Sequence, residues 1–331
     1  MPVHIFQVDE TNFEICRKYG LAGIFDAERG NINDTLISRL SLMRIGDPVL
    51  FYVGRSSIKK EKSKKELYGV WKVSSEPFYD TCPVWTDQVY PYRICVEELD
   101  GAVFKTPIRL SDIYHLIDTG RIWTFALMRN HTSVNAVFSM TAQEYDVIYD
   151  EFIKVNQDGP TVQYLTEPYR NSDSPLMKRL HYEKGLPKFE SSLMALLADG
   201  LKTHTYSDVL HHYSDYSMYV PTNWGKEIDM LLIHGHPKKT DTISSYDIIE
   251  VKKQQFDEAG LEQLLDYKSW FIQNRVRGDA QMVRSIAIAQ SFHPNVIKYL
   301  QMRSKYEKKN ISLLNYTGAP DGKIQLAPYD I

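Results

Sequence analysis

Two carboxylates and one amine lie in neighbouring apolar runs and carry the strongest chemical signal in the sequence. The first run, Lys226–Leu232, contains Asp229, and the second, Ile248–Lys252, ends on Glu250, a valine and Lys252. Because side chains alternate across a strand, Glu250 and Lys252 point to the same face while the valine points into the core. The pattern therefore places an acid beside an amine.

An antiparallel hairpin between the two runs would bring the acids together. Pairing Ile233 with Tyr246 across the polar stretch between the runs sets Asp229 opposite Glu250. Two converging carboxylates are unfavourable unless a cation neutralises them, and hard oxygen ligands suit Mg²⁺, for which Mn²⁺ is a substitute. We expect Asp229 and Glu250 to hold this metal, which would polarise a phosphate and lower the pKa of an attacking water. Lys252 would orient that water or stabilise the developing charge.

Three further polar side chains fit the same site, and each has a structural alternative. Glu190, near the start of a preceding helix, could supply another carboxylate or only a favourable charge at the helix N-terminus. Gln263 and Tyr267 are four residues apart and share one helical face, where they could equally be a solvent-facing residue and a core-edge residue. The alternative for the central trio is a surface ion pair in a hairpin.

These side chains need an α/β domain to position them. One-sided apolar spacing predicts a helix at residues 188–199 that stops at Gly200, and Asp257 can cap another helix at residues 258–272. Compact apolar runs predict buried strands. We expect these strands at residues 228–233, 246–251, 285–289 and 311–316, and a further helix at 295–307.

The order of residues over about residues 180 to 318 resembles the PD-(D/E)XK nuclease superfamily, and the matching positions are Glu190, Asp229, Glu250-Val251-Lys252 and Gln263-x-x-x-Tyr267. The resemblance looks closest to branches with a Gln-x-x-x-Tyr helix, such as RecB-like nucleases and the archaeal NucS-type endonuclease domain. It implies Asp229 and Glu250 as metal ligands, Lys252 as the catalytic lysine and Glu190 as an auxiliary acid. The leading proline of the family name is absent, because Ile228 precedes Asp229.

The first half of the chain predicts a small mixed barrel. Short alternating runs predict strands at residues 3–8, 48–53, 67–73, 93–97 and 134–140, with helices at 13–19, 33–42 and 142–155. A polar stretch with three prolines follows and is typical of an interdomain linker. We therefore expect domains at residues 1–155 and 180–331, joined by a linker at residues 156–179.

Several segments of this half resemble, in order and spacing, the PUA-like barrels of the EVE and YTH families. They are His4–Val8, Asn12, Tyr19–Leu21, Gly46–Tyr52, Leu67–Trp71, and Trp85 shortly before Tyr90–Ile94. Such domains hold one modified base, flipped out of its strand, inside an aromatic cage with polar groups on its edge. The resemblance implies Trp85 as the cage wall and Asn12 and Asn33 as the polar contacts.

The aromatic cage is incomplete by the YTH template. Where those domains carry a cage tryptophan, this chain has Ala22, so Phe25 or Trp123 would have to complete the cage. Trp85 could instead be a core or rim tryptophan, and Asn33 could serve only as a helix cap.

The net charge and the length of the apolar runs limit the classes of binding partner that we expect. The net charge of −3 argues against general electrostatic capture of nucleic acid, so binding must come from local patches. One such patch is a dense lysine cluster, which would contact phosphates; the alternative is a solvated hairpin loop. The members of this cluster are Lys59, Lys60, Lys62, Lys64 and Lys65. No run approaches the roughly 18 apolar residues of a membrane span, so we expect a cytoplasmic protein with no membrane partner.

Together these interpretations predict a Mg²⁺-dependent DNA endonuclease directed to modified bases by its N-terminal reader, as in modification-dependent restriction. Cutting both strands usually needs two active sites, so a homodimer is expected. Two other functions stay open. A structure-specific or mismatch repair endonuclease would cut unmodified branched substrates, whereas a non-catalytic binder of modified RNA or DNA would show no metal-dependent cleavage.

Overall fold

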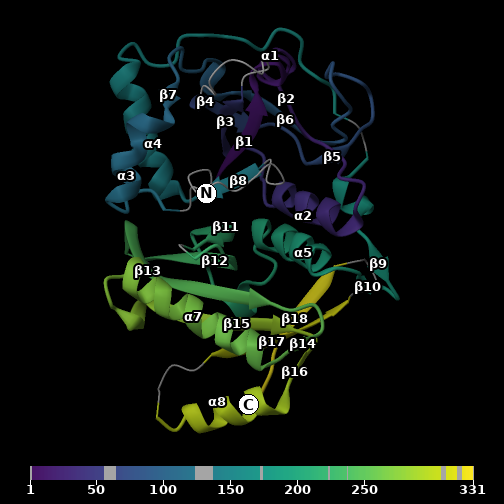
Figure 1. Cartoon of the computed structure of the whole chain (residues 1–331), viewed down its shortest axis with the longest axis vertical. Coiled ribbons are helices and arrows are strands. Elements are labelled where there is room, and N and C mark those ends of the chain that lie inside the picture. The colour runs from purple at the N-terminus through teal and green to yellow at the C-terminus, as the bar shows by residue number, and fades with distance from the viewer. Residues whose placement is uncertain are drawn as a thin grey trace. The chain divides into compact units, whose positions relative to one another are not determined.

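The computed structural model consists of two compact units, Met1–Leu180 (unit 1) and His181–Ile331 (unit 2), each built around its own sheet (Figure 1). It describes residues 2–55, 65–123, 137–171, 174–222, 224–236, 238–306, 311–318 and 323–330. Within these ranges no helix combines the length and the apolar character needed to cross a membrane.

Unit 1 contains a curled half-barrel sheet, which agrees with the mixed barrel expected from the sequence. Its described strands are β1 (Val3–Asp9), β2 (Leu21–Ile24), β3 (Pro48–Arg55), β4 (Glu66–Val73), β5 (Phe78–Tyr79), β6 (Tyr92–Glu98), β7 (Ile108–Arg109) and β8 (Val137–Met140). The order along the sheet is β2-β6-β4-β3-β1-β8, with β5 on β6 and β7 on β4. Strands β1 and β3 run parallel, and the other pairs are antiparallel.

Four helices of unit 1 lie in the described residues: α1 (Glu10–Tyr19), α2 (Gly30–Ser41), α3 (Tyr114–Asp118) and α4 (Ala142–Val155). Local signals set their ends. The Asp9 carboxylate accepts from the backbone N–H of Asn12 and so caps α1, which ends at Gly20 with a left-handed φ of 59°. A capping box between Thr141 and Glu144 begins α4, whose apolar face closes the barrel core.

The described part of residues 156–179, expected to be a linker, is held on unit 1. Val162 forms an antiparallel bridge with Val103. The backbone N–H groups of Tyr164 and Leu165 both donate to one carboxylate oxygen of Glu98. A short 3-10 helix, Leu176–Arg179, ends the segment, and polar groups of the barrel accept from several of its backbone N–H groups. The sequence pattern did not indicate these partners.

Unit 2 contains a mixed sheet in the order β11-β12-β13-β15-β17-β18. The strands are β11 (Asp215–Pro221), β12 (Glu227–His236), β13 (Lys239–Val251), β15 (Val283–Ala289), β17 (Ser312–Gly318) and β18 (Ile324–Pro328). β11, β12 and β13 pair antiparallel, and β13, β15 and β17 pair parallel. Ile233 pairs with Tyr246, so the register expected for the hairpin is confirmed. Two short pairs flank the sheet: β9 (Tyr182–Glu183) with β10 (Leu186–Pro187), and β14 (Gln255–Phe256) with β16 (Ser291–Phe292).

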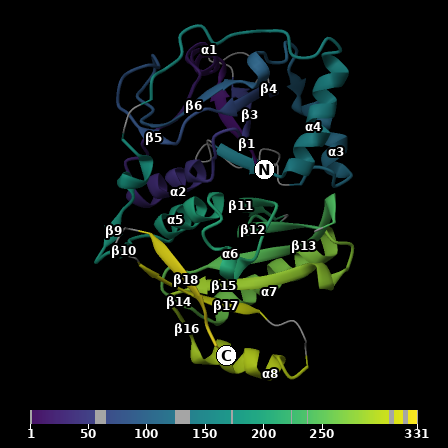
Figure 2. The same ribbon diagram turned by 180° about the vertical axis from the view of Figure 1, so that it is seen from behind.

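The described helices of unit 2 are α5 (Glu190–Lys202), α6 (Ser207–Leu210), α7 (Glu258–Asn274) and α8 (Pro294–Arg303). Helix α7 covers one side of the sheet (Figure 1), and there Phe271 packs against Tyr246 of β13. Helix α6 lies on the other side (Figure 2), and the carbonyl of Leu210 in α6 accepts from Arg284 of β15. The Asp257 cap of α7 is confirmed, because its carboxylate accepts from the Gly260 N–H.

The expected stop of α5 at Gly200 is wrong. The helix continues to Lys202, and Gly200 is buried inside it. A Cβ at this position would overlap the ring of Tyr206. Gly200 is therefore explained by the close approach of the Tyr206 ring, not by the backbone conformation of a helix end.

Candidate active site

Asp229, Glu250 and Lys252 come together at the ends of β12 and β13. The observed pairing of Met230 with Ile249, continued by one residue, sets Asp229 opposite Glu250. The backbone N–H of Val251 donates to Oδ2 of Asp229 at 2.7 Å, and the Lys252 ammonium donates to Oε1 of Glu250 at 2.6 Å. Glu250 is fully buried. The acid-beside-amine arrangement expected from alternation is therefore present.

The carboxyl groups of this site resist ionisation in the metal-free protein. Burial and the charge of Glu250 raise the pKa of Asp229 well above its usual range, although the Val251 N–H opposes the shift. Burial raises the pKa of Glu250 to about 7, against the charge and hydrogen bond of Lys252. Burial lowers the pKa of Lys252, but the Glu250 carboxylate outweighs this effect, and the net pKa is raised.

The residues fit a divalent cation. Oε2 of Glu250 is buried and has no hydrogen-bond partner among the described residues, although an ionised oxygen normally requires one. Over the described ranges no three carboxylate, imidazole or thiol side chains gather closely enough to form a metal cage. Mg²⁺ does not need such a cage, because it is usually held by one or two carboxylates and keeps several waters. Two carboxylates with an unsatisfied oxygen match that requirement.

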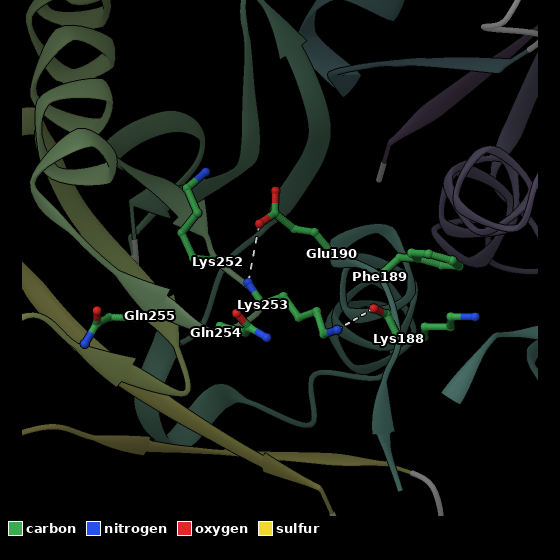
Figure 3. Close-up of a pocket in the computed structure, with 7 residues that line it drawn as sticks. All are labelled: Lys188, Phe189, Glu190, Lys252, Lys253, Gln254 and Gln255. Atoms are coloured by element: carbon green, nitrogen blue, oxygen red, sulfur yellow. Dashed lines mark hydrogen bonds between the residues drawn. The ribbon is translucent and has the colours of Figure 1, made fainter. Parts of the chain in front are cut away.

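Glu190 is the first residue of α5 and borders the same site. Its Oε2 accepts from the backbone N–H of Lys253 at 3.3 Å, and its charge raises the pKa values of both Glu250 and Lys252. A cavity of about 450 Å³ lies beside it, and Figure 3 shows Glu190 and Lys252 on the same side of the segment that carries Lys253. The lining residues are Lys188, Phe189, Glu190, Lys252, Lys253, Gln254 and Gln255. Three lysines around this cavity give it a cationic wall.

Gln263 and Tyr267 form a hydrogen-bonded pair on one face of α7, as their spacing predicts. The Gln263 amide donates to the Tyr267 hydroxyl at 2.8 Å, and that hydroxyl donates to the carbonyl of Glu227 at 2.7 Å. Glu227 begins β12, two residues before Asp229. Tyr267 is buried, with only 1% of its surface exposed. Through these hydrogen bonds the pair holds the start of β12, the strand that carries Asp229, in position.

Two of the three base-binding residues proposed for unit 1 meet around Tyr90. The Asn12 amide donates to the Tyr90 hydroxyl at 2.9 Å, and the ring centroids of Trp85 and Tyr90 lie 5.0 Å apart. Trp85 is only 6% exposed, because its ring covers Gly23 and the Arg93 guanidinium lies over it. A base could stack on Trp85 only if a neighbour moved, and the cage role stays a prediction. Oδ1 of Asn12 is buried with no donor among the described residues.

Asn33 and the lysine cluster lie elsewhere. The Asn33 side chain accepts from the Ala27 N–H at 2.8 Å and donates to Asp26 at 2.7 Å, so it stabilises the turn before α2. It does not cap the helix, because the N-cap residue of α2 is Arg29 and no side chain makes the capping hydrogen bond. Lys65 is exposed directly before β4. The other members of the cluster fall outside the described residues, and they are Lys59, Lys60, Lys62 and Lys64.

One polar network of unit 2 was missed by the sequence analysis. The Asp247 carboxylate accepts from Nε of Arg284 at 2.8 Å, and its Oδ2 lies 2.9 Å from Nε2 of His234. Burial lowers the pKa of His234, but the Asp247 hydrogen bond and charge raise it overall. Asp247 and Glu250 are three residues apart on β13, so the network lies on the opposite face of the sheet from the carboxylate pair. No local motif links these three residues, because β12, β13 and β15 bring them together.

Several known proteins are similar to parts of this chain. Human THYN1 protein in complex with 5-methylcytosine-containing DNA is 12% identical with a TM-score of 0.32, over 46% of this chain and 98% of that one. A repair endonuclease from Pyrococcus abyssi is 11% identical with a TM-score of 0.28, over 90% and 99%. An EndoMS–double-stranded DNA complex is 10% identical with a TM-score of 0.23, over 87% and 94%. All three TM-scores lie below 0.5, so these likenesses establish no shared overall fold.

Comparison of the sequence with protein-family models identifies a domain in unit 1. No curated protein matches the chain. The family model of the EVE domain matches residues 35–151, about a third of the chain. The match falls inside unit 1 and confirms the EVE part of the resemblance drawn from the sequence. Residues 35–151 therefore form an EVE domain.

Proposed function

We propose that unit 2 hydrolyses phosphodiester bonds of DNA with a bound divalent cation, Mg²⁺ or Mn²⁺. The observation that carries this proposal is the convergence of Asp229 and Glu250 beside Lys252. Both acids have raised pKa values, and Glu250 keeps one buried oxygen without a partner among the described residues. The pair is unfavourable alone and becomes favourable around a cation. Its order along the chain also resembles the PD-(D/E)XK superfamily.

Each residue of the site has a chemical role in this reaction. When bound, the metal would polarise the phosphate and lower the pKa of an attacking water. Asp229 and Glu250 would hold it through their carboxylates. Lys252 would donate from its ammonium to a phosphate oxygen and stabilise the negative charge that develops there. The hydrogen bond from Tyr267 to the Glu227 carbonyl keeps the Asp229 strand in position.

The cavity beside Glu190 would receive the DNA backbone. Lys188, Lys252 and Lys253 are among its lining residues, so the positive charges of Lys252 and Lys253 beside it would attract a phosphate chain. Glu190 would offset part of that charge and complete the acidic set near the metal. A homodimer would supply two such sites, one for each strand.

We further propose that unit 1 reads a modified base and directs cleavage, as in modification-dependent restriction. The EVE domain match and the resemblance to PUA-like readers support this role. The buried Oδ1 of Asn12, which has no donor among the described residues, supports it chemically, because this acceptor would pair with a donor on the edge of a flipped base. Trp85, next to Tyr90, would supply the surface on which the base stacks after a neighbouring side chain has moved.

The nuclease proposal is tested by digestion of otherwise identical duplexes that differ in one modified base, with Mg²⁺ or with chelator. Wild type should cut only with metal and should prefer one modified duplex. Asp229→Asn and Glu250→Gln should abolish cutting, whereas Glu262→Gln, an exposed glutamate of α7, should cut normally. Cutting by either active-site variant would contradict the assignment. Preferential cutting of unmodified branched duplexes over plain ones would instead favour a structure-specific repair nuclease.

The reader proposal needs a mild substitution, because Trp85 is buried and its removal to alanine would cost about 3–5 kcal/mol of stability. Trp85→Phe should reduce the preference for modified over plain duplex in binding titrations. Trp71→Phe is the matched control, since Trp71 is a buried tryptophan of the same unit that packs edge-on against Phe13 and Phe51. Full preference retained by Trp85→Phe would place the base pocket elsewhere.

A further inference from the structure

Trp224 exposes more of its surface than any other tryptophan of the chain, although it lies close to the candidate active site. It sits in the turn between β11 and β12, and 42% of its surface is exposed. Its ring stacks on Tyr267 with centroids 6.1 Å apart and an interplanar angle of 23°. Trp270 meets it edge-on at 5.7 Å. Two aromatic side chains thus support the ring, and its remaining surface faces solvent.

A cavity of about 550 Å³ adjoins this aromatic group, which is within the size range of small-molecule sites. Its lining residues are Trp224, Asp266, Ser269, Trp270, Gln273 and Asn274. They offer a carboxylate, a hydroxyl and two amides next to an exposed aromatic face. The Asn274 amide nitrogen donates to the Trp270 carbonyl at 2.8 Å, which fixes its orientation.

The chemistry of this cavity selects its ligand. Of the described residues that line it, none is a lysine or an arginine, and Asp266 is acidic, so a phosphate would be repelled. A flat, uncharged ring with amino and carbonyl groups on its edge matches both the aromatic surface and the polar groups. A nucleobase has these properties, and every base offers a π-face for stacking.

Tyr267 connects this cavity to the catalytic residues. One face of its ring supports Trp224, and its hydroxyl donates to the Glu227 carbonyl, two residues before Asp229. Burial raises the pKa of Tyr267 against the hydrogen bond of Gln263, and the charges of Glu250 and Asp229 raise it further. A base on Trp224 would therefore be connected to the strand of Asp229 through one side chain, Tyr267.

We propose that Trp224 and this cavity bind one unpaired nucleobase of the nucleic-acid substrate and so position a neighbouring phosphate at Asp229 and Glu250. This inference rests on the proposed nuclease function of unit 2. The base must be unpaired, because a base within a duplex is already stacked on both faces. Stacking on an aromatic side chain is worth about 1–3 kcal/mol, or about five- to 150-fold in affinity.

The test measures binding without cleavage. Full-length protein in EDTA is titrated by fluorescence anisotropy against labelled duplexes that carry one unpaired nucleotide or, at the same position, an abasic site. Wild type should bind the duplex with the unpaired base about five- to 150-fold more tightly. Trp224→Ala should bring this ratio close to one, whereas Trp224→Phe should retain part of it because phenylalanine still offers a π-face.

Tyr299→Ala is the matched control, since Tyr299 of α8 is also 42% exposed in unit 2. It should leave the ratio unchanged, and unfolding midpoints will show that both alanine variants are folded under the binding conditions. A wild-type ratio of one, or the full ratio in Trp224→Ala, would overturn the proposal. Cleavage is measured separately with Mg²⁺. Wild type that shows the expected ratio and never cuts would contradict the nuclease assignment while leaving the base site in place.

Discussion

Replacing Glu250 with glutamine should make the metal-free protein less sensitive to rising pH. Burial raises the pKa of Glu250 to about 7, whereas the ordinary value is 4.5. Between these two values the folded protein keeps a proton that the unfolded chain has released. The free energy of unfolding therefore falls as pH rises through this window and levels off above the folded pKa.

The size of the effect follows from the two pKa values. Each pH unit inside the window changes the free energy of unfolding by about 1.4 kcal/mol, so the interval from 4.5 to about 7 corresponds to roughly 3 kcal/mol. The raised pKa of Asp229 adds to the loss in the same direction. The raised pKa of Lys252 contributes nothing here, because its stabilisation is fully present below the ordinary value of 10.5.

Urea unfolding in EDTA, from about pH 5 to about pH 8, measures this difference. The difference between wild type and Glu250→Gln cancels the pH dependence of all other groups that keep their environment, and it should shift by roughly 3 kcal/mol in favour of the variant. Glu262→Gln is the exposed control and should track wild type. At about pH 8, Mg²⁺ should raise the unfolding midpoint of wild type but not of Glu250→Gln, because binding to the folded state stabilises it.

Two outcomes would refute the reasoning. If wild type and Glu250→Gln lose stability in parallel across the pH range, Glu250 does not titrate as a buried acid. If Mg²⁺ stabilises both proteins equally, Glu250 is not a ligand, whatever its pKa.

Three other predictions concern the Tyr267 hydrogen bond, the packing at Gly200 and the lysine cluster. Tyr267→Phe should lower the free energy of unfolding by about 1 kcal/mol and slow cleavage, because the Glu227 carbonyl no longer has its donor; urea midpoints and turnover rates will show both effects. Gly200→Ala should destabilise the protein, because overpacking against Tyr206 costs about 1–3 kcal/mol and exceeds the helical gain of up to about 1 kcal/mol; a wild-type midpoint would contradict the packing. Replacing every lysine of the cluster with glutamine should reduce the slope of log binding constant against log salt concentration by about 0.9 for each phosphate that is no longer neutralised. An unchanged slope would mean that the cluster is a solvated loop. The replaced residues are Lys59, Lys60, Lys62, Lys64 and Lys65.

The hairpin of unit 2 could be predicted in detail because its constraints are local. Two compact apolar runs are joined by a short polar stretch, and the pairing of Ile233 with Tyr246 sets their apolar residues side by side. That register alone places Asp229 against Glu250. The Asp257 cap was predictable for the same reason, since the capping side chain and the N–H that it receives are three residues apart.

Tertiary packing was not predictable in this way. Gly200 was expected to end its helix because the sequence does not indicate that the Tyr206 ring packs against it. Trp85 looked like an open aromatic wall, but Gly23 and Arg93 cover its ring from other parts of the barrel. The exposed ring of Trp224 carried no motif, and only the fold brings it onto Tyr267 of α7.

A catalytic role explains the Asp229, Glu250 and Lys252 arrangement better than a structural one. A buried ion pair kept for stability needs its remaining oxygens satisfied, because desolvation otherwise exceeds the Coulombic gain. Here one oxygen of Glu250 has no partner in the described residues, and a second acid faces it across the strands. In the absence of a cation both acids have raised pKa values, so the arrangement lowers stability around neutral pH. A divalent cation would remove the repulsion and satisfy the free oxygen at once, and such costly clusters are characteristic of functional sites.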